Sequence, residues 1–119
     1  MPPRFTFVLL ACGALIAASA QAYDLQFLTK TPYANFSKED KKLLMQNIDK
    51  ALDEGKEGDT VAWNNDSTGA AGTITPEKSF ERDGRKCRAV RIHNTFKTLK
   101  GEGSYNFCQD KNGKWQLAQ

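Results

Sequence analysis

Apolar positions recur at helical spacing between residues 37 and 54, in the stretch "SKEDKKLLMQNIDKALDE". They form one apolar stripe along a helix, made of Leu44, Ile48, Ala51 and Leu52. Ser37 followed by Asp40 is typical of a capping box, which favours a helix that begins at this point. Gly55 predicts a left-handed C-terminal cap. The pattern therefore indicates one amphipathic helix over residues 37–54, with its charged residues on a solvated face.

From residue 59 onward the pattern changes to a period of two, which indicates β-strands. The expected strands are 59–65, 71–76, 78–82, 86–96, 103–108 and 114–118, with the second ending at Pro76 because proline cannot donate to a strand ladder. Asp83-Gly84 and Asn112-Gly113 are dipeptides that favour type I′ hairpin turns. The sequence predicts an α+β domain in which the helix packs on an antiparallel meander of about five short strands.

The first 22 residues have the three parts of a secretory signal peptide. Arg4 precedes an apolar run, and the run ends in the cleavage pattern Ala20-Gln21-Ala22. The run is shorter than the roughly 20 residues that a membrane span needs, so we expect no transmembrane span after cleavage. Lipidation of Cys12, which follows Leu9-Leu10-Ala11, is the alternative. Cleavage after Ala22 leaves an extended segment over 23–36, which docks Leu25, Phe27 and Leu28, and a domain over 37–119.

The charge of the exported chain argues against a nucleic-acid binder. Of the 17 Lys and Arg residues only Arg4 lies in the signal peptide, which leaves 16 against 14 Asp and Glu, a net charge of +2. A dedicated nucleic-acid binder shows a strongly basic stripe, and the charges here are mixed along the chain. Export to an oxidising compartment also predicts that the cysteines of the chain pair.

Two cysteines, Cys87 and Cys108, remain after cleavage. Strand alternation places both on the more polar face of their strands, and in the strand of Cys87 this is the face away from Val90 and Ile92. They can form a disulfide if they lie across from each other on neighbouring strands, because the Cα atoms must come within about 7 Å. Redox-active thiols and a metal site remain alternatives, although a zinc site needs three or four protein ligands and the chain adds only His93.

Catalytic motifs of the common kinds do not occur in the sequence: there is no G-x-S-x-G elbow, phosphate loop or zincin motif. The carboxylates fall on the expected helix surface and in turns, and the glycines at 69, 72, 101 and 103 between strands, where turn formation explains them. The sequence predicts no catalytic residue and no cofactor. We expect the aromatic and aliphatic residues to form the core instead, with these members: Leu44, Ile48, Trp63, Val90, Ile92, Tyr105, Phe107 and Trp115.

Three segments in order, "TVAWNNDSTGAAGTITP", "RDGRKCRAVRI" and "YNFCQDKNGKWQL", resemble the C-terminal domain of the rickettsial-type 17-kilodalton outer-membrane surface antigens. The resemblance covers about 59–117, and the preceding segment is similar to small exported proteobacterial proteins with this domain. It implies family positions for Cys87 and Cys108, core positions for both tryptophans, and turn positions for Gly69, Gly72 and Gly113. The glycine-rich segment that precedes the domain in longer antigens is absent.

The resemblance implies a periplasmic or outer-membrane-associated protein of a Gram-negative cell, with no established enzymatic activity. We expect a periplasmic location, with outer-membrane association or secretion as the alternatives. We therefore expect a non-catalytic domain that binds or supports another envelope component, either a protein or peptidoglycan. A redox or metal-binding role for Cys87 and Cys108, and a secreted enzyme inhibitor, are the alternative functions. No sequence feature names the partner.

Overall fold

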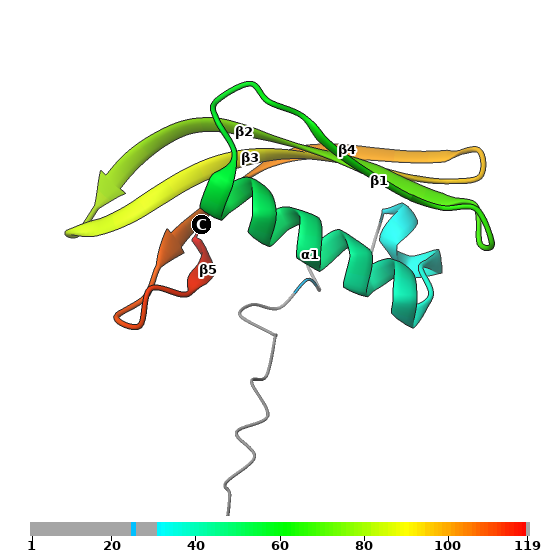
Figure 1. Ribbon diagram of the computed structural model, residues 1–119, viewed down its shortest axis with the longest axis horizontal. Coiled ribbons are helices and arrows are strands. Elements are labelled where there is room, and N and C mark those ends of the chain that lie inside the picture. Colours follow the sequence, from blue (N-terminus) through cyan, green and yellow to red (C-terminus); the bar gives the residue numbers. More distant parts are fainter. Residues whose placement is uncertain (1–24, 26–30, 119) are drawn as a thin grey trace, which may run out of the picture.

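The computed structural model describes residue 25 and residues 31–118, and it contains one α-helix and a single antiparallel sheet (Figure 1). The strands follow one another in chain order across the sheet, as in a meander. The elements are η2 (Pro32–Asn35), α1 (Lys38–Glu54), β1 (Val61–Asn65), β2 (Ala70–Arg82), β3 (Arg85–Phe96), β4 (Leu99–Gln109) and β5 (Trp115–Ala118). The structure has the predicted α+β architecture of one helix and five antiparallel strands, but β2, β3 and β4 are 13, 12 and 11 residues long rather than short.

Several expectations for the N-terminal part lie outside the described residues. These are the signal peptide over 1–22, lipidation of Cys12, and the docking of Phe27 and Leu28. Leu25 is buried, with 3% of its surface exposed. The structure differs from the expected extended segment at one point, because Pro32–Asn35 form a 3-10 helix. Thr31 caps this turn, accepting a hydrogen bond from the backbone N–H of Tyr33.

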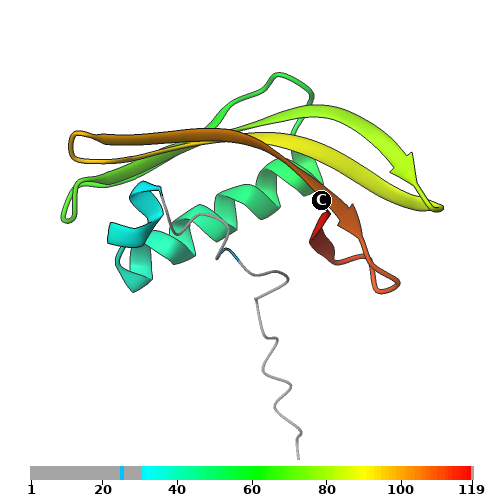
Figure 2. The ribbon, with the colours of Figure 1, turned by 180° about the vertical axis from the view of Figure 1, so that it is seen from behind.

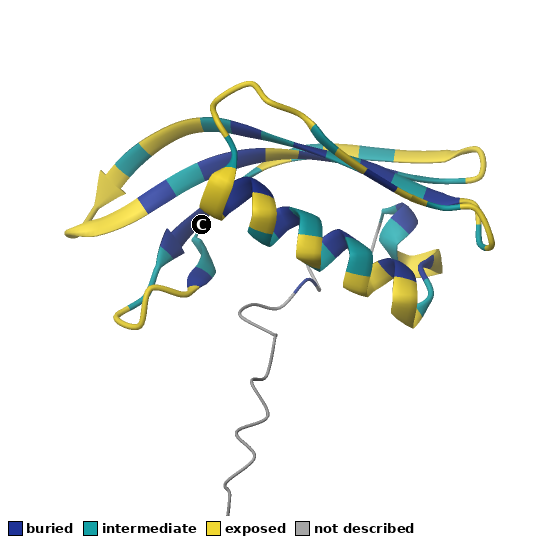
Figure 3. Cartoon of the chain, in the orientation of Figure 1, coloured by how far each residue is buried: buried dark blue, intermediate teal, exposed yellow. Residues whose placement is uncertain are grey.

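Helix α1 begins where the capping pattern predicts. The Ser37 side chain accepts a hydrogen bond from the Asp40 backbone at 3.1 Å, and the Asp40 carboxylate accepts one from the Ser37 backbone at 2.9 Å. This reciprocal pair satisfies two backbone donors that a helix N-terminus otherwise leaves without partners. The buried positions of α1 face the concave side of the curved sheet (Figures 1 and 3).

The left-handed cap predicted at Gly55 is wrong. Gly55 has a φ of −70° and a ψ of 138°, which is extended backbone open to any residue. Glycine is needed here for space instead. A Cβ atom built on Gly55 would lie 2.5 Å from the Ala51 carbonyl oxygen and 2.6 Å from the Pro76 Cγ. The chain leaves α1 in direct contact with β2, so a side chain has no room.

This steric cause predicts that Gly55→Asn destabilises the protein by about 1–3 kcal/mol, the usual cost of overpacking. A left-handed cap would instead tolerate asparagine. Gly113→Asn is the matched control, because Gly113 has a φ of 77° and a Cβ atom added there would meet no other atom within 4 Å. We expect it to cost less than about 1 kcal/mol. Chemical denaturation of both variants measures the difference; equal costs would contradict the steric explanation.

Strand β2 does not end at Pro76, as the sequence predicted, but continues for 13 residues to Arg82. Proline is tolerated because β1 pairs only with residues 70–74 of β2. The Pro76 carbonyl points toward this unpaired edge, where it accepts the Gly58 N–H at 2.8 Å. The missing proline N–H therefore removes no ladder bond. The register shifts between Pro76 and Ser79, and the long β2–β3 hairpin extends beyond β1 (Figure 1).

The two predicted hairpin turns have different conformations. Asp83 and Gly84 have φ values of 52° and 75°, the two left-handed residues of a type I′ turn. In the β4–β5 turn only Gly113 has a positive φ. The Asp110 carboxylate shapes this turn, because it accepts hydrogen bonds from the backbone N–H groups of Asn112 and Lys114 at 2.8 and 3.0 Å.

The core lies between α1 and the concave face of the sheet. Seven of the residues named above are buried in one cluster, and Tyr105 is partly buried against it. The seven are Leu44, Ile48, Trp63, Val90, Ile92, Phe107 and Trp115. Three glycines that the sequence assigned to turns lie within strands, Gly72 in β2 and Gly101 and Gly103 in β4. The expected strands 71–76 and 103–108 already included Gly72 and Gly103, and only Gly101 lay outside every expected strand. A Cβ on Gly72 would lie 2.6 Å from the Trp63 Nε1 atom, so this glycine makes room for the indole ring.

Candidate functional site

Cys87 and Cys108 form a disulfide, with their Cα atoms 4.0 Å apart. They are directly opposite each other in the β3–β4 register. Phe80 of β2 pairs with Cys87, and Gln116 of β5 pairs with Cys108, so a neighbouring strand flanks the bridge on each side. The bridge is therefore buried, with 2% and 5% of the two cysteines exposed, although it lies on the face predicted to be polar.

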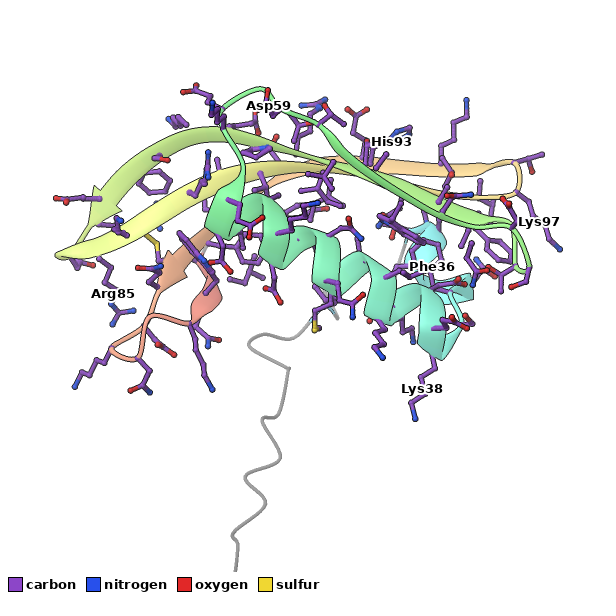
Figure 4. All side chains as sticks on the ribbon, viewed as in Figure 1. Phe36, Lys38, Asp59, Arg85, His93 and Lys97 are labelled. Atoms are coloured by element: carbon purple, nitrogen blue, oxygen red, sulfur yellow. A yellow bond between two sulfur atoms is a disulfide. The ribbon has the colours of Figure 1, made fainter. Side chains whose placement is uncertain are left out.

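His93 lies far from the disulfide in the same strand. It is half-buried on the side of the sheet opposite α1 (Figure 4), and the paired residue on β4 is Glu102. Beside it, Arg91 donates a hydrogen bond to the Glu102 carboxylate; that bond and the positive charge of Arg91 lower the pKa of Glu102. Both partners are about half exposed, so this pair contributes little to stability.

An open hollow lies beside the disulfide, between the last turn of α1, the end of the β2–β3 hairpin and β5. Seen from behind, the end of β4 bends away from the rest of the sheet together with β5 (Figure 2). We call this site the disulfide-end hollow. Its walls include Leu52, Asp53, Phe80, Lys86, Arg88 and Trp115, with Cys87 beside them.

Two side chains fix the walls of the hollow to the end of α1. The Arg88 Nη1 donates to the carbonyl oxygens of Ala51 and Leu52 at 3.3 Å each. Since α1 carries no basic residue in its last turn, Arg88 of β3 supplies the positive charge that favours a helix C-terminus. The indole Nε1 of Trp115 donates to the Asp53 carboxylate at 2.8 Å, which ties β5 to the same turn.

The hollow combines aromatic and charged groups. Phe80 is half-buried, and the Arg82 guanidinium lies 5.4 Å from its ring centre. The Arg88 Nε is buried and has no hydrogen-bond partner among the described residues. Sequence reasoning placed Trp115 in the core but missed Arg88 and Phe80. The alternation of β3 contained the signal for Arg88, because Arg88, Val90 and Ile92 occupy alternate positions and share the face toward α1.

Asp40 forms a second polar cluster at the opposite end of α1. The sequence placed the carboxylates on the helix surface and in turns, which is wrong for Asp40, whose exposed fraction is 0%. Its Oδ1 accepts from the Asn65 amide at 2.8 Å and from the Thr68 hydroxyl at 2.9 Å. Burial raises the pKa of Asp40, but hydrogen bonds from the Ser37 backbone, Thr68 and Asn65 outweigh it and leave the pKa below its ordinary value. These contacts join the helix to the β1–β2 turn, which indicates a structural role.

Within residue 25 and residues 31–118, no three His, Cys, Asp or Glu side chains gather closely enough to hold a metal ion. The disulfide ties up both thiols in this part of the chain. The same residues include no helix that is long and apolar enough to cross a membrane.

Comparison with known proteins connects this site to a family. The profile of the family described as "17 kDa outer membrane surface antigen" matches residues 50–116, which is more than half of the chain. The chain belongs to this family. The matched segment includes all five strands except the last residues of β5, both cysteines, and every residue named above as lining the disulfide-end hollow.

Relatives of this surface antigen domain occur in Rickettsia. The 17 kDa surface antigen of Rickettsia bellii is 27% identical over 106 residues, which cover 88% of this chain and 67% of that protein. The 17 kDa surface antigen of Rickettsia prowazekii is 28% identical over 81 residues, or 66% of this chain and 50% of the relative. The chain therefore spans between half and two thirds of these relatives. No solved structure matches the chain. The surface antigen family indicates an envelope-associated, non-catalytic protein.

Proposed function

We propose that this surface antigen domain binds another component of the cell envelope and that the disulfide-end hollow is the binding site. The observation that supports the site is the presence of Phe80, Arg88 and Trp115 around one open hollow. Aromatic residues and arginine contribute most of the binding energy in many interfaces. The hollow also lies within the segment that the family shares.

The walls of the hollow are held in place before any partner binds. The disulfide joins β3 to β4, Arg88 joins β3 to α1, and Trp115 joins β5 to α1. A preorganised site loses little conformational entropy on binding. Phe80 is half-buried at the end of a hairpin that β1 does not reach, whereas Trp115, the other aromatic residue that lines the hollow, is buried. A partner that covers its ring gains hydrophobic free energy.

The envelope location of this proposal rests on the family and on the signal-peptide pattern of residues 1–22. The Rickettsia relatives are named surface antigens, which favours an outer-membrane or surface-exposed location, and a periplasmic location is compatible with the export signal. The domain has no catalytic role in this proposal; it supports or positions its partner.

Site-specific photo-crosslinking in living cells tests the proposal. A benzophenone amino acid replaces Lys86, which is exposed and lines the hollow. The matched control position is Asn64, which is exposed on β1. We expect a discrete crosslinked product from position 86 and none from position 64, and Phe80→Ala should reduce the yield at position 86 because it removes the apolar contact.

The product also identifies the class of partner. A muramidase-sensitive product indicates peptidoglycan, and a protease-sensitive product of fixed mass indicates a protein. Equal products at positions 64 and 86, or none at position 86 in properly folded protein, would overturn the hollow as the binding site.

A further inference from the structure

The outer edge of β4 is a second candidate surface, separate from the hollow. Strand β5 pairs with β4 only at residues 106–109, at the end of β4 remote from the β3–β4 turn (Figure 1). Among the described strands, none pairs with the outer edge of residues 99–104. Leu99 at the start of this edge is the exposed large hydrophobic residue of the described chain, with 51% of its surface exposed. A free strand edge is a template for pairing with another strand.

The β3–β4 register shows which backbone groups this edge presents. The Cα atoms of Cys87 and Cys108 lie 4.0 Å apart, a spacing typical of a pair without mutual backbone hydrogen bonds. The register continues without a shift to the turn, so Ser104, Glu102 and Lys100 occupy the same kind of position. The backbone N–H and C=O groups of these residues therefore point away from β3, toward the free edge.

From this edge we infer that β4 pairs antiparallel with β4 of a second copy of the chain, about a two-fold axis at Gly101. This register places Lys100 opposite Glu102 of the partner copy and Glu102 opposite its Lys100. Both residues have outward-pointing backbone groups, so the pairs form ladder hydrogen bonds. Each Glu102 carboxylate, which already accepts a hydrogen bond from Arg91 of its own chain, then also lies beside Lys100 of the partner copy. Registers centred on Lys100 or on Glu102 instead place like charges opposite each other, which is unfavourable.

On the other face of the same edge, Leu99 lies opposite Gly103 of the partner copy, and the two Gly101 residues face each other at the axis. Thr31 and Pro32 of each copy pack over Gly101 on this face, since a Cβ atom built there would lie 3.1 Å from the Thr31 Cβ and 2.8 Å from the Pro32 Cδ. The apolar surface of Leu99 is covered by the partner strand. An interface of one strand edge is smaller than the roughly 1,200–2,000 Å² of stable complexes, and we therefore expect weak, reversible dimers.

Sedimentation measurements on the protein purified from cells in its natural form test this inference. We expect dimers to form as the protein concentration is raised to about 1 mM. High salt should dissociate them, because the contacts are exposed ion pairs. Lys100→Glu and Glu102→Lys each create two like-charge contacts and should raise the dissociation constant at least about tenfold. Lys111→Glu, an exposed charge reversal in the β4–β5 turn, should leave it unchanged.

A mixture of the two variants provides the decisive experiment. One copy then presents glutamate at both positions and the other presents lysine at both, so the two-fold register is complementary again. We expect the mixture to form heterodimers with the affinity of the wild-type protein. A wild-type protein that stays monomeric at about 1 mM, or a mixture that does not associate, would overturn the inferred interface. Neither result bears on the hollow, which is tested separately.

Discussion

Replacing both Cys87 and Cys108 by alanine should lower the free energy of unfolding by about 3 kcal/mol, since the bridge closes a loop with a sequence separation of 21. Total stabilities of small domains are about 5–15 kcal/mol, so the loss is a large fraction. Denaturation by guanidinium, followed by the fluorescence of the two buried tryptophans, measures the change. The hollow should also lose affinity for its partner, because Cys87 lies beside its wall.

Reduction of the wild-type protein separates the cross-link from the packing of the two sulfur atoms. Full reduction of the disulfide with an excess of a strongly reducing thiol should destabilise the protein by nearly as much as the double substitution, since the cross-link acts mainly on the unfolded chain. Mild glutathione should leave the bond intact, because the bridge is buried. A change below about 1 kcal/mol would show that the bridge does not act as a structural staple, and rapid reduction by glutathione would favour the redox alternative.

Local sequence rules predicted the elements whose causes are local. The Ser37 and Asp40 pair determines the start of α1 through hydrogen bonds within one turn. Asp83-Gly84 produces the β2–β3 turn because its backbone conformation depends on the two residues themselves. The phase of β3 and β4 brought the cysteines to one face, and the structure adds the register that places them opposite each other.

The predictions that were wrong concern positions whose conformation depends on residues far away in the sequence. Pro76 continues a strand because β1 stops before it, and Gly55 is required because Pro76 packs against it. Neither contact can be recognised from the residues around the position alone. The hollow could not be predicted from local sequence for the same reason, because Asp53, Arg88 and Trp115 belong to three elements that meet only in the folded chain.

Asp40→Ala is expected to lower the free energy of unfolding at neutral pH by about 2–4 kcal/mol. The substitution removes the acceptor of the Ser37, Asn65 and Thr68 hydrogen bonds and leaves those donors without the carboxylate in a buried site. Glu39→Ala is the matched control, since Glu39 is an exposed acid in the same helical turn. It should cost less than about 1 kcal/mol through the helix dipole.

The pH dependence of the free energy of unfolding distinguishes the buried, ionised Asp40 from an exposed carboxylate. The folded-state pKa of Asp40 lies below its ordinary value of 3.8, so the ionised form stabilises the fold above that value, and this contribution is lost as the pH falls through the lowered pKa. The difference in stability between wild type and Asp40→Ala should therefore be constant above about pH 5 and shrink in more acidic solution. The Glu39→Ala difference should stay small throughout. Equal costs for the two variants, or an Asp40→Ala cost that does not fall in acid, would contradict the proposed ionised network between α1 and the β1–β2 turn.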